Sequence, residues 1–158
     1  MAQFHEQSFA RRFGQMGDEA EKVFEAVYPQ GFARFGLNRP PINLTNIPPF
    51  VRFMPDYLTA KGLVEVQGFG TDQIAKFKVQ KLDVLRQWHR LFRVDFFLWD
   101  RTNLRYGWLR LNDLEEAMPW IHAELRSFHE GNQYWAIPAA NLPVIEWVGS
   151  GGDLGAAR

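Results

Sequence analysis

An acidic and an amide side chain share one stretch of sequence in a way that could build a metal site. Glu65 and Gln67 belong to the alternating segment 63–67, in which valines fill the positions between them. Because successive side chains of a strand point to opposite faces, Glu65 and Gln67 would share one face while the valines turn toward the core. An unpaired carboxylate is costly to bury, and a bound metal ion would remove that cost. An exposed strand face is the alternative interpretation.

Asp56 is the second candidate acid. It follows Pro55 at the end of the apolar segment 50–54. If residues 50–56 and 62–69 are neighbouring antiparallel strands, Asp56 and Glu65 converge on one edge of the sheet. Hard oxygen ligands with room for water suit Mg²⁺ or Mn²⁺, which can activate a water and stabilise charge on a phosphate. The alternative is that Asp56 only forms a turn.

These residues resemble the motif of a nuclease superfamily. Pro55-Asp56 followed by Glu65-x-Gln67 is similar to the PD-(D/E)xK motif of restriction endonucleases and archaeal Holliday junction resolvases. Residues 17–21 resemble the start of the first helix in the junction-resolvase branch, and Glu21 is the best match to its metal-binding acid. The resemblance covers roughly the first two-thirds of the chain. It implies a restriction-endonuclease-like core of a helix, three strands, a helix and a strand.

The resemblance also implies roles for individual residues. One or two Mg²⁺ or Mn²⁺ ions would be held by Glu21, Asp56, Glu65 and the main-chain carbonyl of Val66. Gln67 stands where the family usually has lysine, and some restriction endonucleases carry Gln there. A neutral amide can position a water by hydrogen bonding but supplies no charge. Lys76 or Lys78 would provide the missing cation, so we count Asp56, Glu65, Gln67 and Lys78 as the catalytic candidates.

Basic residues follow the motif and are candidates for binding DNA phosphates. Lys76 and Lys78 would share a strand face, and Arg86 and Arg90 are one helical turn apart. The predicted DNA-binding residues are Lys76, Lys78, Lys81, Arg86 and Arg90. The alternative is an ordinary solvated face of charged side chains.

The elements that must position these residues follow from the periodicity of the apolar side chains. We predict helices at 17–28, 81–92 and 112–118, and strands at 50–54, 62–69, 76–80, 94–99, 106–111 and 133–138. Residues 29–49 carry five prolines, which predicts a long irregular connection or lid. The order predicts an α/β fold in which residues 1–148 form a single nuclease-fold domain. Its core is extended by C-terminal strands and a short helix, and residues 149–158 form a flexible tail.

Composition limits the classes of function. The chain has 158 residues, a formal net charge of zero and no cysteine. Zero net charge gives no general attraction to nucleic acid, so DNA affinity must come from local basic clusters. The lack of cysteine excludes disulfides, zinc–cysteine sites and thiol nucleophiles, and it is compatible with a reducing cytoplasm. No signal-peptide pattern or membrane-length apolar run is present, so we expect a soluble protein with no membrane partner.

The leading hypothesis is metal-dependent hydrolysis of phosphodiester bonds in DNA, including branched DNA. Resolution of a junction needs two symmetric cuts, which implies a homodimer. The expected location is the cytoplasm, that of a bacterial host if the protein is phage-encoded, with the virion as the alternative. A catalytically inactive nuclease-fold protein, structural or DNA-binding and in contact with other phage particle proteins, is the rival hypothesis. A third is an unrelated α/β binding protein whose acids face solvent.

Overall fold

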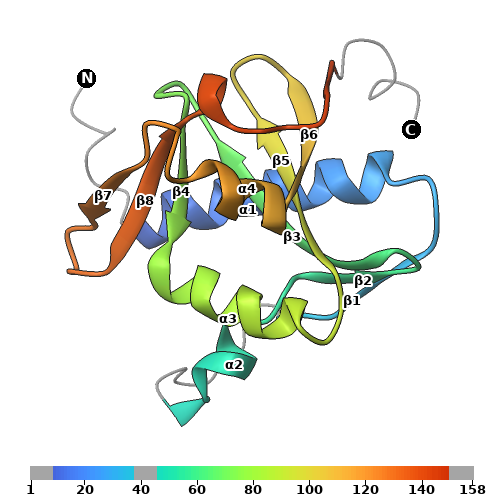
Figure 1. Cartoon of the computed structure of the whole chain (residues 1–158). Coiled ribbons are helices and arrows are strands. Elements are labelled where there is room, and N and C mark those ends of the chain that lie inside the picture. Colours follow the sequence, from blue (N-terminus) through green and yellow to red (C-terminus); the bar gives the residue numbers. More distant parts are fainter. Residues whose placement is uncertain (1–8, 38–45, 150–158) are drawn as a thin grey trace.

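The computed structural model describes residues 9–37 and 46–149, with only the backbone described for residues 9–16. It is an α/β structure with a mixed six-stranded sheet, in the order β1-β2-β3-β5-β6-β9, and a three-stranded sheet, in the order β4-β8-β7 (Figure 1). The strands are β1 (Phe32–Arg34), β2 (Tyr57–Thr59), β3 (Gly62–Phe69), β4 (Ile74–Lys78), β5 (Val94–Asp100), β6 (Arg105–Arg110), β7 (Glu124–Ser127), β8 (Gln133–Pro138) and β9 (Trp147–Gly149). The helices are α1 (Phe9–Val27), α2 (Pro49–Arg52), α3 (Val79–His89), α4 (Leu111–Ala117) and the 3₁₀ turn η2 (Ala139–Asn141).

Strand β3 is the centre of the larger sheet. It pairs antiparallel with β2, where Tyr57 lies opposite Val64, and parallel with β5, where Glu65 lies opposite Phe96. A parallel pair needs a crossover connection, and β4 with α3 supplies it between β3 and β5.

Both faces of this sheet are covered. Val64 and Val66 belong to the core beneath α1, together with Phe24. Leu63 and Phe69 belong to a second core with side chains of α3, α4 and β4. Figure 1 shows α1 behind the sheet and α3 and α4 in front of it. Glu65 shares a face with Leu63 and Phe69, so its carboxylate lies on the buried α3 side rather than in solvent.

The predicted fold class is confirmed. The order helix, three strands, helix and strand is present in α1, β2, β3, β4, α3 and β5, with β1 and α2 inserted between α1 and β2. The predicted bounds of β3 and β8 are those observed. Additional C-terminal strands and the short helix α4 follow, as predicted. No helix in residues 9–37 and 46–149 has the length and apolarity needed to cross a bilayer.

The predicted strand at 50–54 is wrong, because this segment contains the short helix α2. A proline at its first position suits a helix start, and the ring of Phe50 stacks on Trp88 of α3 at a centroid distance of 4.2 Å. The strand that pairs with β3 is instead β2, which follows Asp56.

The segment predicted to be irregular, residues 29–49, contains β1 and the first residue of α2, and its residues 38–45 lie outside the described chain. Two further strands, β7 and β9, were not predicted. Gly149, the predicted first residue of the tail, ends β9, and residues 150–158 lie outside the described residues.

Candidate active site

Asp56 and Glu65 lie beside each other because of the β2–β3 hairpin. Tyr57 is opposite Val64, so one step further along both strands sets Asp56 next to Glu65 on the α3 face. Asp56 Oδ2 accepts a hydrogen bond from the main-chain N–H of Val66 at 2.8 Å. Because the N–H and C=O of one strand residue point to the same edge, the Val66 carbonyl also opens toward Asp56. The hairpin thus brings three oxygen-bearing groups to one place.

Glu65 is buried, with 6% of its surface exposed. Its Oε1 lies 2.5 Å from Nζ of Lys81, whereas Oε2 has no hydrogen-bond partner among the described residues. Burial and then the charge of Asp56 raise the pKa of Glu65 to about 8, even though Lys81 lowers it. Without a further cation Glu65 is therefore mostly protonated at neutral pH, and a bound divalent ion would favour its ionised form.

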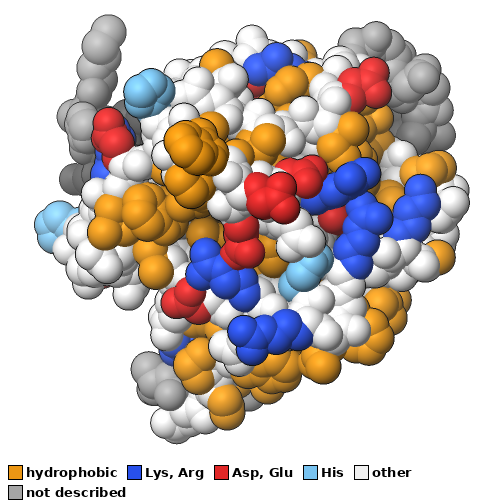
Figure 2. All heavy atoms as spheres, in the orientation of Figure 1, with side chains coloured by type: hydrophobic (Ala, Val, Ile, Leu, Met, Phe, Trp, Pro, Cys, Tyr) orange, Lys and Arg blue, Asp and Glu red, His pale blue; other side chains and the backbone are white. Residues whose placement is uncertain are grey.

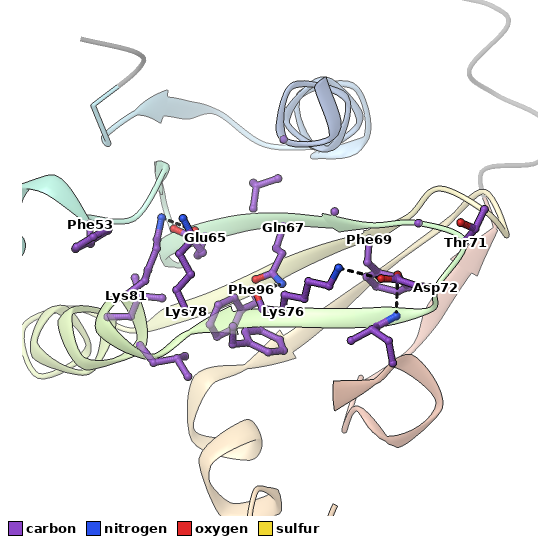
Figure 3. Close-up of a pocket in the computed structure, with 18 residues that line it drawn as sticks. Phe53, Glu65, Gln67, Phe69, Thr71, Asp72, Lys76, Lys78, Lys81 and Phe96 are labelled. Atoms are coloured by element: carbon purple, nitrogen blue, oxygen red, sulfur yellow. Dashed lines mark hydrogen bonds and ion pairs between the residues drawn. The ribbon is translucent and has the colours of Figure 1, made fainter. Parts of the chain in front are cut away.

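Lys81 lies in the first turn of α3, and its side chain extends back to the two acids. Burial alone would lower the pKa of Lys81, but the charges of Glu65 and Asp56 outweigh it and raise that pKa. Figure 3 shows Lys81 extending toward Glu65, with Lys78 beside it. Lys81 was predicted to contact DNA phosphates. In the structure its ammonium group instead forms an ion pair with Glu65, close to the charge of Asp56.

Glu21 forms a separate ion pair on the α1 face of the sheet. Its carboxylate accepts hydrogen bonds from Arg34 at 3.1 and 2.7 Å. Arg34 lies over the ring of Tyr57 and donates to its hydroxyl, which in turn donates to Glu25 at 2.6 Å. The structure thus joins Asp56 and Glu65 but pairs Glu21 with Arg34. Within residues 9–37 and 46–149, no three acidic or histidine side chains are grouped as ligands of one metal ion.

Gln67 connects β3 to β4. Its Nε2 donates a hydrogen bond to the main-chain oxygen of Lys76 at 2.9 Å, although the two strands belong to different sheets. Nζ of Lys76 lies 2.9 Å from Asp72 Oδ2. Nζ of Lys78 lies 5.5 Å from the ring centroid of Phe128, and burial, followed by the charge of Lys81, lowers the pKa of Lys78. Of the three lysines near the motif, Lys81 is the one that pairs with Glu65.

A cavity of about 450 Å³ separates β3 from β4. Figure 3 shows it extending from Glu65 and Lys81 at one end to Phe69 and Thr71 at the other. Apolar side chains, including Phe77 and Phe96, line it between these ends. The acidic pair therefore stands at the wall of a hollow of the size that binds small ligands, typically about 300–1,000 Å³.

The two predicted DNA-binding arginines lie further along α3. Arg86 is paired with Asp83 at 2.6 Å and also with Glu115. Arg90 ends the helix and is exposed. Figure 2 shows acidic and basic side chains intermixed on this side of the molecule, so no large patch of one sign forms there.

The donor set fits a hard divalent cation. Mg²⁺ is commonly bound through one or two carboxylates, with water completing its shell. Asp56, Glu65 and the Val66 carbonyl offer this set, and the unpartnered Oε2 of Glu65 is the atom that such an ion would satisfy.

Two features of the site were not predicted from the sequence. The first is the ion pair between Lys81 and Glu65. The sequence indicated it only through spacing, since Lys81 comes three residues after Lys78, at the point where strand β4 gives way to helix α3. Arg34, which holds Glu21, comes from the proline-rich segment, where no periodicity marked it.

No protein-family model matches the chain, and no curated protein matches its sequence. Among solved structures, the chain is similar to Hjc, a Holliday junction resolvase from the archaeal hyperthermophile Archaeoglobus fulgidus. The TM-score is 0.47 and the sequence identity 13%, over 80% of this chain and 92% of that chain. Similarity at this level assigns no activity to the present chain.

Proposed function

We propose that this protein hydrolyses phosphodiester bonds in DNA with the help of Mg²⁺ or Mn²⁺, at a site formed by Asp56, Glu65 and Lys81. One observation carries the proposal: two carboxylates and an ammonium group meet at the wall of a cavity, and one oxygen of Glu65 is buried without a partner. An isolated structural ion pair would satisfy its own atoms, whereas this group retains capacity for a further cation.

Each residue has a distinct part in the proposed reaction. Asp56, Glu65 and the Val66 carbonyl would hold the ion, and Asp56 is fixed by its hydrogen bond from the Val66 N–H. A bound divalent cation supplies positive charge that stabilises the developing charge on a phosphate and makes water a better nucleophile. Lys81 would approach a phosphate oxygen, in the role expected from the sequence for Lys76 or Lys78. Gln67, bound to β4, would hold the cavity wall and orient a water through its side-chain oxygen.

The substrate would be DNA, including branched forms, and two copies of the chain would act together on a symmetric junction. Glu21 would become a metal ligand only if its ion pair with Arg34 broke. The Arg34–Glu21 pair would therefore determine whether two or three carboxylates bind the ion.

A cleavage assay tests the activity. Labelled linear, flapped and four-way junction DNA would be incubated with wild-type protein, Asp56→Ala and Glu65→Ala, in Mg²⁺, in Mn²⁺ and in chelator. We expect nicking by the wild type with metal and a loss of about 100-fold or more in either variant. Glu124→Gln, an exposed acid on β7 paired only with Arg126 among described residues, is the matched control and should cleave normally. Equal cleavage by wild type and Asp56→Ala would overturn the proposal.

One observation favours the second candidate, a catalytically inactive DNA-binding or structural protein with this scaffold. Lys81 already forms an ion pair with Glu65, and the side-chain amide of Gln67 already donates a hydrogen bond to the backbone of β4. Calorimetric titration with Mn²⁺ separates the candidates. Heat that disappears in Asp56→Ala supports the metal site, and absence of metal binding in the wild type supports the inactive scaffold.

A further inference from the structure

A second cavity of about 450 Å³ opens on the face of the larger sheet that carries α1. It lies past the C-terminal end of α1 and is bounded by β3, β5, β6 and the segment leading to β9. Val64 of β3 lines it, whereas the adjacent Glu65 faces the other side of the sheet. This cavity is therefore separate from the proposed metal site, and none of the catalytic candidates lines it.

Aromatic side chains form one wall of the second cavity. Tyr28, Tyr106 and Trp108 line it and are each partly exposed. Trp108 packs edge-on against Phe97 at 5.3 Å between ring centroids and lies 6.0 Å from the ring of Tyr28. Tyr106 stacks on the same Phe97 at 5.3 Å. The rings are held by the core beneath them, and their planes are inclined to one another: Tyr106 lies at 24° and Trp108 at 74° to Phe97. They therefore form a preformed aromatic corner, in which a planar ligand can stack on one ring and meet the other with its edge.

An acid with one unsatisfied oxygen lies in the same cavity. Asp95 Oδ2 is paired with Arg93 at 2.8 Å, but Oδ1 is buried and has no hydrogen-bond partner in the described part of the chain. A buried acceptor without a donor is destabilising, so a ligand that brings an N–H group to it gains binding energy there. Asp95 Oδ1 would thus favour a ligand that carries a hydrogen-bond donor at this point.

The rim of the cavity is basic. Lys61, Arg93 and Arg110 line it and are exposed. Arg93 is committed to Asp95, while the side chains of Lys61 and Arg110 make no ion pair with any described residue. One acid, Glu146, also lines the cavity. The two uncommitted cations suit an anionic group that remains at the solvent edge while a ring enters the cavity.

We infer that this cavity binds a nucleotide whose base carries an amino group. The base would stack on Trp108, meet Tyr106 with its edge and donate its amino N–H to Asp95, and its phosphate would meet Lys61 and Arg110. Aromatic surface, a buried acceptor and a basic rim are the three features that recognise such a ligand. The nucleotide is either free or an unpaired residue of a strand, since both present the same groups. The inference does not depend on the proposed hydrolysis.

The test compares dCMP with dUMP, which differ at position 4, where cytosine has an amino group and uracil a carbonyl. By calorimetry on the full chain, we expect dCMP to bind about tenfold more tightly than dUMP. In Asp95→Asn the preference should vanish or reverse, because an amide can donate to the uracil carbonyl. Glu116→Gln, an exposed acid of α4 away from both cavities, should keep the wild-type preference.

Two further measurements show where the ligand binds and whether it is a free nucleotide or part of a strand. Trp108→Phe should retain calorimetric binding of dCMP but lose the fluorescence quenching that base stacking causes in the wild type. Tighter binding of a short oligodeoxycytidylate than of dCMP would assign the site to an unpaired strand, and the reverse would assign it to the free nucleotide. Equal binding of dCMP and dUMP by the wild type, or binding of neither nucleotide and neither oligomer, would overturn the inference.

Discussion

At the residue scale, Lys81 decides how the acidic pair is balanced. Its Nζ lies 2.5 Å from Glu65, so it both neutralises the carboxylate and competes with any ion for it. For Lys81→Met we expect DNA cleavage to fall about 100-fold, because the charge that stabilises the phosphate is lost. Mn²⁺ affinity measured by calorimetry should rise in the same variant, because the competing ammonium is gone. Lys81→Arg should retain more activity than Lys81→Met, and a Lys81→Met variant that cleaves at the wild-type rate would show that Lys81 is only structural.

Asp100 offers a test of stability against pH at a residue far from the proposed chemistry. It is fully buried, and burial would raise its pKa, but hydrogen bonds from Asn103, Gln73 and Arg105 outweigh this and lower the pKa below the usual 3.8. A carboxyl whose folded-state pKa is lowered adds stability above its unfolded pKa and loses it as pH falls through the folded value.

Asp100→Asn should therefore cost about 2–3 kcal/mol of unfolding free energy at neutral pH. The difference from wild type should shrink as pH falls below 3.8. Urea unfolding across this range measures both quantities. Asp113→Asn, in the first turn of α4, provides a comparison outside the network, and a pH-independent cost of Asp100→Asn would contradict the assigned cause.

At the scale of elements, the β2–β3 turn sets the alignment of Asp56 with Glu65. Gly62 has a φ of 134°, and a Cβ there would lie 2.5 Å from the main-chain oxygen of Arg93. Gly62→Ala should thus destabilise the fold by about 2 kcal/mol or more, through both backbone strain and the clash. Denaturant unfolding measures the loss. Gly31→Ala, where a Cβ meets nothing within 4 Å, should change stability much less, and equal effects of the two substitutions would contradict this role of Gly62.

Elements with long regular patterns could be predicted, and the shortest ones could not. The alternation in 62–69 and the helical spacing after it contain enough residues to fix β3 and α3. Strands β1 and β2 have three residues each; β2 forms because β3 offers an edge to pair with, and β1 pairs in turn with β2. The apolar segment 50–54 resembles a strand, but Pro49 directly before it and the stacking of Phe50 on Trp88 favour a helix.

The site was predictable to the extent that it depends on strand alternation. Glu65 was expected on the face opposite the valines, and it lies there. Asp56 was expected beside it through a strand at 50–56, and the structure sets it there through β2 instead. The pairs Lys81–Glu65 and Arg34–Glu21 join segments 16 and 13 residues apart in sequence, and which cation reaches which acid depends on packing that periodicity does not encode.

At the scale of the whole molecule, the larger sheet separates two hollows with different chemistry. The cavity on the α3 face has the acidic pair in its wall, and the cavity on the α1 face has aromatic rings and a basic rim. The chain has a formal net charge of zero, and acidic and basic side chains are intermixed on the face with α3 and α4 (Figure 2). On the proposed function, DNA would be held by few phosphate contacts and by groups within these hollows rather than by long-range attraction.

The salt dependence of DNA binding tests this view of the whole molecule. Each phosphate neutralised on duplex DNA adds about −0.9 to the slope of log K against log salt concentration. Because Lys76 and Arg86 are already paired with acids, we expect two to four contacts and a slope of about −2 to −4. Fluorescence anisotropy in chelator measures it. Arg90→Gln should flatten the slope by about one contact, whereas Arg126→Gln, whose arginine is paired with Glu124 on β7, should leave it unchanged. A slope of about −6 or steeper would require a basic surface that the described residues do not provide.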